Sequence, residues 1–497
     1  MVIVSVAVIR WRNRTQFFFQ DEWSVLAGRS LSDVSSIIEP HWGHNIVLPA
    51  VAYLSLFEVF GLREYAPYQA LVIGAHLVVV GCLRVIMVRA GVHTWITLSA
   101  CALMLVLGAG QPNVSWGFQV TLTGSLAFGL WAVVLVDRFP AGARERWRYA
   151  CAALLLGLAV LCSGVGLLMV APVGVVLASR RGWATAAAVA ALPVAIYGAW
   201  VIAAPDSRYG APVTNPVDAV AFAFRLVYFT FMRVGGNAVL GWTLIVALAA
   251  GIGVVVAKTS WAQLHSRYGT VSVLLASAGV VAVAIGRSRA TISDPYEPRY
   301  VYLIAALALP ALAVALDRLA RGNAPLIALG CGLLLIPIPA NIGALAPPPS
   351  RAGDPLLVYA LAQQGARMGT RRDFRPFPDV GKAVTIGWLA DTYRSGRTRQ
   401  LPADEPLLEF ALLNLAMEPF PDVWGIGCPD PRPASTDLHL RVGDRFHTTG
   451  SEVRLARTRS PAPSTDIAIP ADTTVEVVWG PLTLEQVGTG PVLLCGP

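Results

Sequence analysis

Long apolar stretches alternate with short polar segments up to about residue 345. A helix needs about 20 mainly apolar residues to cross a membrane, and shorter stretches span it less readily. Ser163 and Gly164 separate two short stretches, for which a single broken helix is the alternative. The pattern predicts a mainly α fold, a polytopic transmembrane helical bundle of about 10–11 spans. The stretches are 67–89, 93–110, 117–137, 149–162, 164–179, 183–203, 238–257, 269–286, 300–317 and 324–340.

A different pattern follows the proline-rich segment Ala346-Pro347-Pro348-Pro349-Ser350. Helical periodicity occurs within 355–397, and short alternating segments bounded by Gly, Asp and Pro come later. We therefore predict a transmembrane domain over 1–345 and an α+β domain over 346–497, with a β-sandwich from about residue 430. The expected strands are 438–442, 452–455, 474–478 and 492–494.

The composition excludes a wholly soluble protein. Of the 497 residues, 55% are hydrophobic and 14% are charged, with a mean hydropathy of +0.59. Soluble domains carry roughly 25% charged residues. The net charge of +8 is scattered through loops without a basic stripe that contains aromatic residues, which argues against nucleic-acid binding.

Basic residues in the short loops predict the orientation in the membrane. Cytoplasmic loops are enriched in Arg and Lys. The loops assigned to the inside contain Arg89, Arg138, Arg144, Arg146, Arg148, Arg180, Arg181, Lys258, Arg267, Arg318 and Arg321. This assignment places 15–66, the 204–237 and 287–299 loops and everything after about 341 outside the cell. We expect a multi-pass protein of the cell membrane with an extracytoplasmic C-terminal domain.

The N-terminal segment is too short for a complete span. Met1 to Ile9 is apolar, and Arg10 follows directly without the features of a signal-peptide cleavage site. We interpret it as a first span truncated by the start of the sequence. The segment 46–62 is then expected to be a helix along the outer membrane surface.

Two cysteines lie apart from those in the apolar stretches. Cys428 and Cys495 occur in the polar C-terminal part, without the CxxC spacing of a zinc site. A disulfide between them suits an oxidising compartment, and two unrelated thiols are the alternative. The other cysteines are expected to pack as small hydrophobic side chains.

The first external loop contains two groups of candidate site residues. Asp21 and Glu22 are adjacent carboxylates flanked by aromatic residues, a pattern that suits a general base or a cation ligand. His41, Trp42 and His44 follow, with side chains that can bind a metal, a phosphate or a sugar. The alternatives are a solvated acidic loop and an interfacial Trp/His anchor.

Two further external segments carry candidate binding groups. Asn113, Trp116 and Gln119 offer amides and an aromatic face of the kind that sugars require, although helix caps and interfacial tryptophans look the same. Arginines in the 287–299 loop violate the charge bias and indicate an anion site; they are Arg287, Arg289 and Arg299. The sequence contains no Walker A, GxSxG or kinase motif, which argues against nucleotide-driven chemistry.

Together these segments resemble the GT-C superfamily of polytopic glycosyltransferases, which use polyprenyl-phosphate sugars. The resemblance covers about residues 15–340, and two features depart from it: the incomplete first helix, and Gln111-Pro112 where related sequences tend to have an acidic residue. It rests on Asp21-Glu22, Pro40-His41-Trp42-Gly43-His44, Gly61-Leu62, Asn113, Trp116, Gln119, and Arg299-Tyr300 with Pro310.

The resemblance implies transfer of a sugar, with inversion, from a polyprenyl-phosphate donor to an extracytoplasmic glycan, glycolipid or protein, as in cell-wall glycan biosynthesis. It implies that Asp21 is the general base and that Glu22 either orients Asp21 or shares a divalent cation with it. No cofactor is certain, and the metal requirement stays open. Donor-phosphate candidates are Arg299, Arg287, Arg289 and His44; sugar or acceptor candidates are His41, Trp42, Asn113, Trp116, Gln119 and Tyr300. The alternative is a lipid or glycolipid flippase or another transporter.

Overall fold

The computed structural model describes most of the chain, with gaps mainly in loops and in the C-terminal third. The described residues are 1–137, 145–204, 215–347, 354–369, 371–377, 383–403, 406–419, 431–433, 437–441, 444–449, 453–457, 467–470, 472–478, 482–486 and 492–495. They form two compact units. Unit 1 comprises 1–16, 30–54 and 66–348, and unit 2 comprises 17–29, 55–65 and 349–497.

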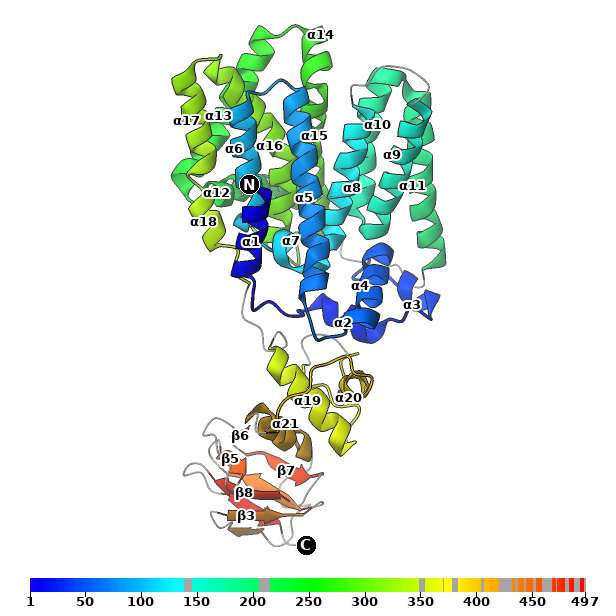
Figure 1. The fold of residues 1–497 in the computed structure, drawn as a ribbon, viewed down its shortest axis with the longest axis vertical. Helices are drawn as coiled ribbons and strands as arrows, with labels where there is room; N and C mark the ends of the chain where they lie inside the picture. The colour runs from blue at the N-terminus through cyan, green and yellow to red at the C-terminus, as the bar shows by residue number, and fades with distance from the viewer. Residues whose placement is uncertain are drawn as a thin grey trace. The chain divides into compact units, whose positions relative to one another are not determined.

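Unit 1 is a bundle of helices (Figure 1). Asparagine side chains cap several of its helices: Asn215, Asn237 and Asn323 accept hydrogen bonds from backbone N–H groups in the first turns that follow them. The helices are α1 (Val2–Arg12), α3 (Val34–Ile38), α5 (Ala66–Arg89), α6 (Thr94–Leu105), η1 (Gly108–Gly110), α7 (Pro112–Ser115), η2 (Gly117–Gln119), α8 (Val120–Val136), α9 (Glu145–Cys162), α10 (Val165–Arg181), α11 (Trp183–Ala203), α12 (Pro216–Gly235), α13 (Ala238–Lys258), α14 (Trp261–Gln263), η3 (Leu264–Tyr268), α15 (Gly269–Arg289), α16 (Pro298–Ala320), α17 (Ala324–Leu335) and α18 (Ile338–Gly343). Helix α4 (Val47–Phe60) begins in unit 1 and ends in unit 2.

The structure confirms a multi-pass helical membrane protein. Among the described residues, seven helical segments are long and apolar enough to cross a membrane. All ten predicted stretches are helical, and the segment 46–62 contains helix α4, as expected. The two short stretches around Ser163 are separate helices, α9 and α10. Gly166 lies so close to the backbone of Ala159 that a Cβ would clash with it, so the chain reverses direction there.

Helix α12 was not predicted, because the sequence places its residues in an external loop. Charged residues such as Arg225 and Arg233 interrupt its apolar side chains, and its buried positions follow a helical period rather than a continuous run. The backbone of Ala219 packs against Gly286, and the Val234 carbonyl accepts a hydrogen bond from Asn341. Both contacts lie at the end of the bundle where α15 and α18 end. Both ends of helix α12 therefore lie at the same end of the bundle, and α12 does not count as a further crossing. The predicted orientation of the helices that follow it is unchanged.

Helix α16 forms the centre of unit 1. Nearly all of its side chains from Tyr300 to Leu316 are buried, although Pro310 lies within it. Gly251 of α13 allows a close approach, since a Cβ there would lie 2.3 Å from the Cβ of Ala315. The neighbours of α16 include α5, α12, α13, α15 and α17.

A buried acidic residue joins four helices at the end of the bundle predicted to face the cytoplasm. Asp137, which follows α8, has 1% of its surface exposed. It pairs with Arg180 of α10 at 2.6 Å and with Arg89 of α5 at 3.7 Å. Thr270 of α15 donates a further hydrogen bond at 2.8 Å. The charges and donors around this carboxylate satisfy it, so we interpret the cluster as a structural clamp.

The described residues of unit 2 include four helices besides the end of α4. They are α2 (Asp21–Gly28), α19 (Pro355–Met368), α20 (Ile386–Arg394) and α21 (Pro406–Ala416). Aromatic rings pack them together: Trp23 of α2 stands edge-on to Trp388 of α20, and Phe57 stacks on the same Trp388 at 5.8 Å. Tyr359 of α19 donates a hydrogen bond to the Leu62 carbonyl at 2.8 Å. These segments, far apart in sequence, therefore share one core.

The strands of unit 2 form two antiparallel sheets, with the orders β1-β7-β4-β9-β2 and β3-β8-β5-β6. The four predicted strands are confirmed as β3, β5, β7 and β9. Alternation of buried and exposed residues is clear in β3, where Leu438 and Leu440 are buried and His439 is exposed. The strands are β1 (Met417–Pro419), β2 (Pro431–Pro433), β3 (Asp437–Leu440), β4 (Arg445–Thr448), β5 (Val453–Arg457), β6 (Ile467–Ile469), β7 (Thr474–Val477), β8 (Leu482–Gln486) and β9 (Val492–Cys495).

The proposed disulfide stays a prediction. Cys428 lies outside the described residues, and Cys495 ends β9 opposite Pro431 of β2. The five cysteines of the apolar stretches are free thiols: Cys82, Cys101, Cys151, Cys162 and Cys331.

Candidate functional site

Asp21 and Glu22 occupy the first turn of α2, in unit 2. Asp21 is half-buried, whereas Glu22 is completely buried. Each carboxylate oxygen of Glu22 accepts a hydrogen bond: one from the Phe19 backbone N–H at 2.7 Å, the other from the Tyr65 hydroxyl at 2.9 Å. The two adjacent carboxylates therefore differ in environment, since Glu22 is held inside the protein and Asp21 is partly accessible.

The turn before Asp21 has an unusual backbone conformation. Gln20 has φ of 43° and ψ of −112°, in a region that favours glycine. The turn is closed by hydrogen bonds from Glu22 N to the Phe19 carbonyl and from Trp23 N to the Gln20 carbonyl, both 3.2 Å long. Backbone strain of this kind persists only where the surrounding structure holds it.

Aromatic side chains surround the buried carboxylate of Glu22. Phe18 stands edge-on to Tyr65, with ring centroids 5.1 Å apart, and lies 5.6 Å from the ring of Trp23. The indole N–H of Trp23 donates to the Phe18 carbonyl at 3.1 Å. The sequence shows the aromatic residues near Asp21, but not that Tyr65, 43 positions after Glu22, is the partner of this carboxylate.

His41 to His44 form a tight turn in unit 1. The backbone N–H of each histidine donates to the carbonyl of the other, at 3.0 and 2.9 Å, while Trp42 and Gly43 have positive φ. The His41 ring packs edge-on against Phe118 at 5.4 Å. Trp42 is 64% exposed, as expected for an interfacial or ligand-facing side chain.

The second histidine of this turn contacts an arginine predicted to bind phosphate. Arg289, in the last turn of α15, donates a hydrogen bond to His44 Nε2 at 2.6 Å. Burial lowers the pKa of His44 to about 4, and the positive charge of Arg289 adds to this effect, followed by His41 and Arg299. His44 is therefore neutral at physiological pH and orients Arg289 rather than adding a positive charge.

Arg299 contributes a second cation near His44. It lies in the first turn of α16, with its guanidinium over the ring of Tyr300 at 5.2 Å. Its Nε is 3.8 Å from a Glu297 carboxylate oxygen, and both side chains are partly exposed. Tyr300 is buried, and Arg287 is half-buried two residues before Arg289. The predicted arginines thus lie at the ends of α15 and α16, and two of them act electrostatically on His44.

The amide-rich segment lies between α6 and α8. Asn113 is fully buried, and neither atom of its amide has a hydrogen-bond partner among the described residues. The Oε1 atom of Gln119, which is 3% exposed, has no partner there either. Thr123 donates to the Asn113 carbonyl at 2.9 Å, which places both amides near the start of α8. Trp116 is buried and packs 6.0 Å from Phe118, so it is not an exposed stacking face.

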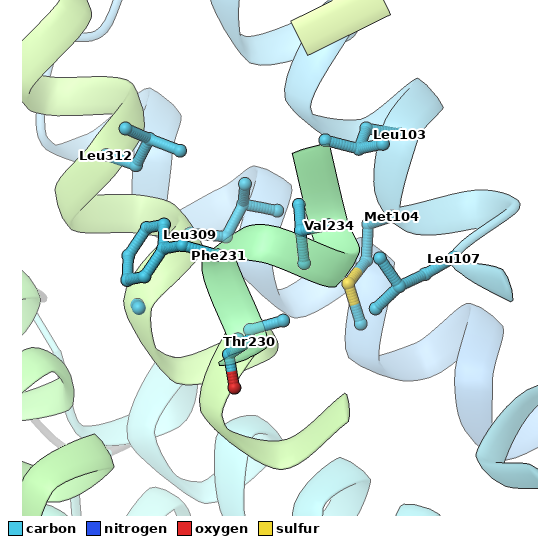
Figure 2. Close-up of a pocket in the computed structure, with 10 residues that line it drawn as sticks. Leu103, Met104, Leu107, Thr230, Phe231, Val234, Leu309 and Leu312 are labelled. Atoms are coloured by element: carbon cyan, nitrogen blue, oxygen red, sulfur yellow. The ribbon is translucent and has the colours of Figure 1, made fainter. Parts of the chain in front are cut away.

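A separate small apolar cavity lies between α6, α12 and α16 (Figure 2). The hydroxyl of Thr230 is its one polar side-chain group, and it donates to the Leu226 carbonyl. A cavity without a titratable group cannot carry out acid–base chemistry. Its lining residues are Leu103, Met104, Leu107, Thr230, Phe231, Val234, Ala305, Ala308, Leu309 and Leu312.

The residues do not fit a metal centre in the described part of the chain. It contains no group of three or more His, Cys, Asp and Glu side chains that could hold a metal ion. Both oxygens of Glu22 accept hydrogen bonds from protein donors, and His44 Nε2 accepts one from Arg289. We therefore derive no chemical step through a metal.

The predicted residues fall into separate groups. Asp21 and Glu22 belong to unit 2, and the histidines, arginines and amides belong to unit 1. Within unit 1, the structure brings His44 together with Arg289, and Arg299 lies in the first turn of α16. Sequence reasoning missed Tyr65, whose signal is weak because a tyrosine at the end of an apolar helix is usually an interfacial residue.

No protein-family model matches the chain, and no curated protein sequence does. In fold, the chain is similar to ArnT from Cupriavidus metallidurans, in crystal structures bound to undecaprenyl phosphate and in the apo state. The TM-scores are 0.48 and 0.47; each comparison gives 16% identity and covers 80% of this chain and 88% of ArnT. The likeness concerns the fold alone.

Proposed function

We propose that this protein is a membrane glycosyltransferase of the GT-C type. It transfers a sugar from a polyprenyl-phosphate donor to an extracytoplasmic glycan, glycolipid or protein. The observation that carries the proposal is the hydrogen bond from Arg289, in the last turn of α15, to His44, together with Arg299 in the first turn of α16. Guanidinium groups bind phosphate well, and His44 accepts a hydrogen bond from Arg289 without competing with the phosphate as an anion would. The polyprenyl tail of such a donor would stay in the bilayer.

Asp21 is proposed as the general base. Its carboxylate takes the proton of an acceptor hydroxyl while that oxygen forms a bond to the anomeric carbon of the sugar. The bond from this carbon to the phosphate oxygen breaks, and its electron pair leaves with the lipid phosphate. A single displacement of this kind inverts the anomeric configuration. Glu22, whose oxygens already accept two hydrogen bonds, takes the orienting role.

The leaving phosphate gains negative charge in the transition state, so its stabilisation is the larger electrostatic task. Arg299 and Arg289 supply the positive charge, with Arg287 as a further candidate, and His44 fixes the direction of the Arg289 guanidinium. His41, Trp42, Asn113, Trp116, Gln119 and Tyr300 remain the proposed sugar or acceptor residues. Trp42 is the most exposed aromatic residue among them, and the amide of Asn113 is buried without partners among the described residues.

The proposal places the C-terminal domain outside the cell, where Cys428 and Cys495 would form a disulfide. The positive-inside bias of the loops supports this orientation. The structure groups several of those loops at one bundle end: Arg267 donates to the Ala90 carbonyl, and Arg180 pairs with Asp137. The His44–Arg289 pair lies at the other end of α15.

The test is transfer of radiolabelled sugar from a panel of polyprenyl-phosphate donors by the purified protein. Asp21→Asn should lower the rate by about 10²–10⁴, because it removes proton acceptance without changing shape. Asp354→Asn is the matched control, since Asp354 caps α19 and asparagine caps a helix equally well. Movement of labelled lipid across vesicle membranes without any transfer would instead identify a flippase.

A further inference from the structure

Glu22 is held from a separate segment of the chain as well as from its own turn. The Phe19 N–H and the Tyr65 hydroxyl donate to different oxygens of its carboxylate, and Glu22 is completely buried. Tyr65 itself is 6% exposed and packs against Phe18. Two hydrogen bonds from different segments thus hold the carboxyl group of Glu22 in one orientation. The contact therefore ties the two segments firmly together.

This carboxylate closes the turn that contains the strained residue Gln20. The turn runs from Phe19 to Glu22, and Gln20 directly precedes Asp21. Relaxation of a glutamine from φ of 43° toward a negative φ lowers the free energy of the backbone, and it would swing the next residue away. The bond from Phe19 N–H to Glu22 opposes this movement, and Tyr65 fixes the carboxylate that accepts it.

We infer that Tyr65 is a positioning residue: through the carboxylate of Glu22, its hydroxyl holds the strained Gln20 turn in the conformation that presents Asp21. The inference rests on the proposed function, and it assigns Glu22 to the protein interior rather than to a shared cation. Tyr65 is buried and its hydroxyl donates to Glu22, so its loss should change the placement of the base and leave donor binding intact.

The first experiment compares kinetics of Tyr65→Phe and Glu22→Gln with wild type. Tyr65→Phe should lower kcat about tenfold with little change in donor KM, because misplacing a catalytic group costs rate rather than binding. Tyr149→Phe is the matched control: it removes a tyrosine hydrogen bond to Glu145 in helix α9, far along the sequence, and should leave kcat unchanged. Equal kcat values for Tyr65→Phe, Tyr149→Phe and wild type would overturn the inference.

A double variant separates positioning from general loss of structure. Glycine adopts positive φ without a steric penalty, so Gln20→Gly removes the tendency of the turn to relax. The variant Gln20→Gly/Tyr65→Phe should therefore recover much of the kcat that Tyr65→Phe loses. A merely structural role for the hydroxyl predicts no recovery. Titration with Mg²⁺ or Mn²⁺ tests the cation alternative: weaker metal activation in Glu22→Gln than in wild type would contradict the assignment.

Hydrogen–deuterium exchange distinguishes failure of this inference from failure of the proposed function. In Tyr65→Phe, amide exchange in a peptide containing Phe19 to Glu22 should become several-fold faster, whereas Tyr149→Phe should not change it. Wild-type protein that transfers sugar from no donor would refute the function, and the exchange result would still test the contact. Unchanged exchange in Tyr65→Phe would refute the positioning role even in an active enzyme.

Discussion

Arginines cluster at both ends of the bundle in unit 1, and their partners differ. At one end, Arg89 and Arg180 surround the buried carboxylate of Asp137. At the other, Arg289 donates to neutral His44, and the ion pair of Arg299 is a 3.8 Å contact with partly exposed Glu297. A buried carboxylate accepts from the arginines at the Asp137 end, whereas the printed acceptor of Arg289 is an imidazole. The partner, rather than the arginine, therefore distinguishes a structural clamp from an anion site.

The largest expected effect is a loss of kcat/KM for arginine variants at the His44 end but not at the Asp137 end. Arg299→Ala and Arg289→Ala should each lower kcat/KM by about 10²–10³, since each removes a charge that stabilises the leaving phosphate. Arg180→Ala should leave kcat/KM of the folded protein within about threefold, because its partner is Asp137. The measurement is sugar transfer normalised to folded protein. Equal losses at the two ends would show that the comparison has no functional meaning.

The next effect concerns stability at the Asp137 end. Asp137→Asn should destabilise unit 1 by about 3 kcal/mol, because it leaves two arginines beside a buried neutral group. Thermal unfolding in detergent measures the change. Asn341→Asp adds a charge to a buried polar position at the opposite end and serves as a comparison for general damage to the bundle. An unfolding midpoint of Asp137→Asn equal to that of wild type would contradict the interpretation of the Asp137 cluster as a structural clamp.

Much of unit 1 could be predicted because membrane spans follow directly from continuous apolar stretches. Helix α12 could not, since its buried residues recur with a helical period and arginines stand between them. The strands β3, β5, β7 and β9 alternate visibly, whereas β1 and β2 contain three residues each and depend on pairing with later strands. Short segments of this kind carry too little local signal.

The candidate site shows the same division between local and long-range information. Residue types and loop positions indicated Asp21, His44, Arg289 and Arg299. The contact between His44 and Arg289 joins residues 245 positions apart and follows only from the packing of α15. The buried state of Glu22 likewise depends on Tyr65. The sequence therefore suggested which residues belong to the proposed site. In the fold, His44 and Glu22 orient their neighbours, whereas Arg289 supplies charge and Asp21 is partly accessible.

The smallest expected effect is a pH dependence at the His44 end. The pKa of His44 is lowered from its ordinary value of 6.5 to about 4 in the folded protein, so the unfolded chain binds the proton more readily. Stability is therefore fully present above about pH 6.5 and falls as the pH decreases toward 4. At pH 5 the loss should be about 1–2 kcal/mol, and His44→Gln, which can still accept from Arg289, should reduce it. Unfolding midpoints at pH 7 and pH 5 test this.

His447→Gln is the matched comparison, since burial also lowers the pKa of His447, which belongs to unit 2. If His44→Gln loses as much stability as wild type between these pH values, folding does not lower the pKa of His44, and the burial of this imidazole beside Arg289 does not oppose its protonation.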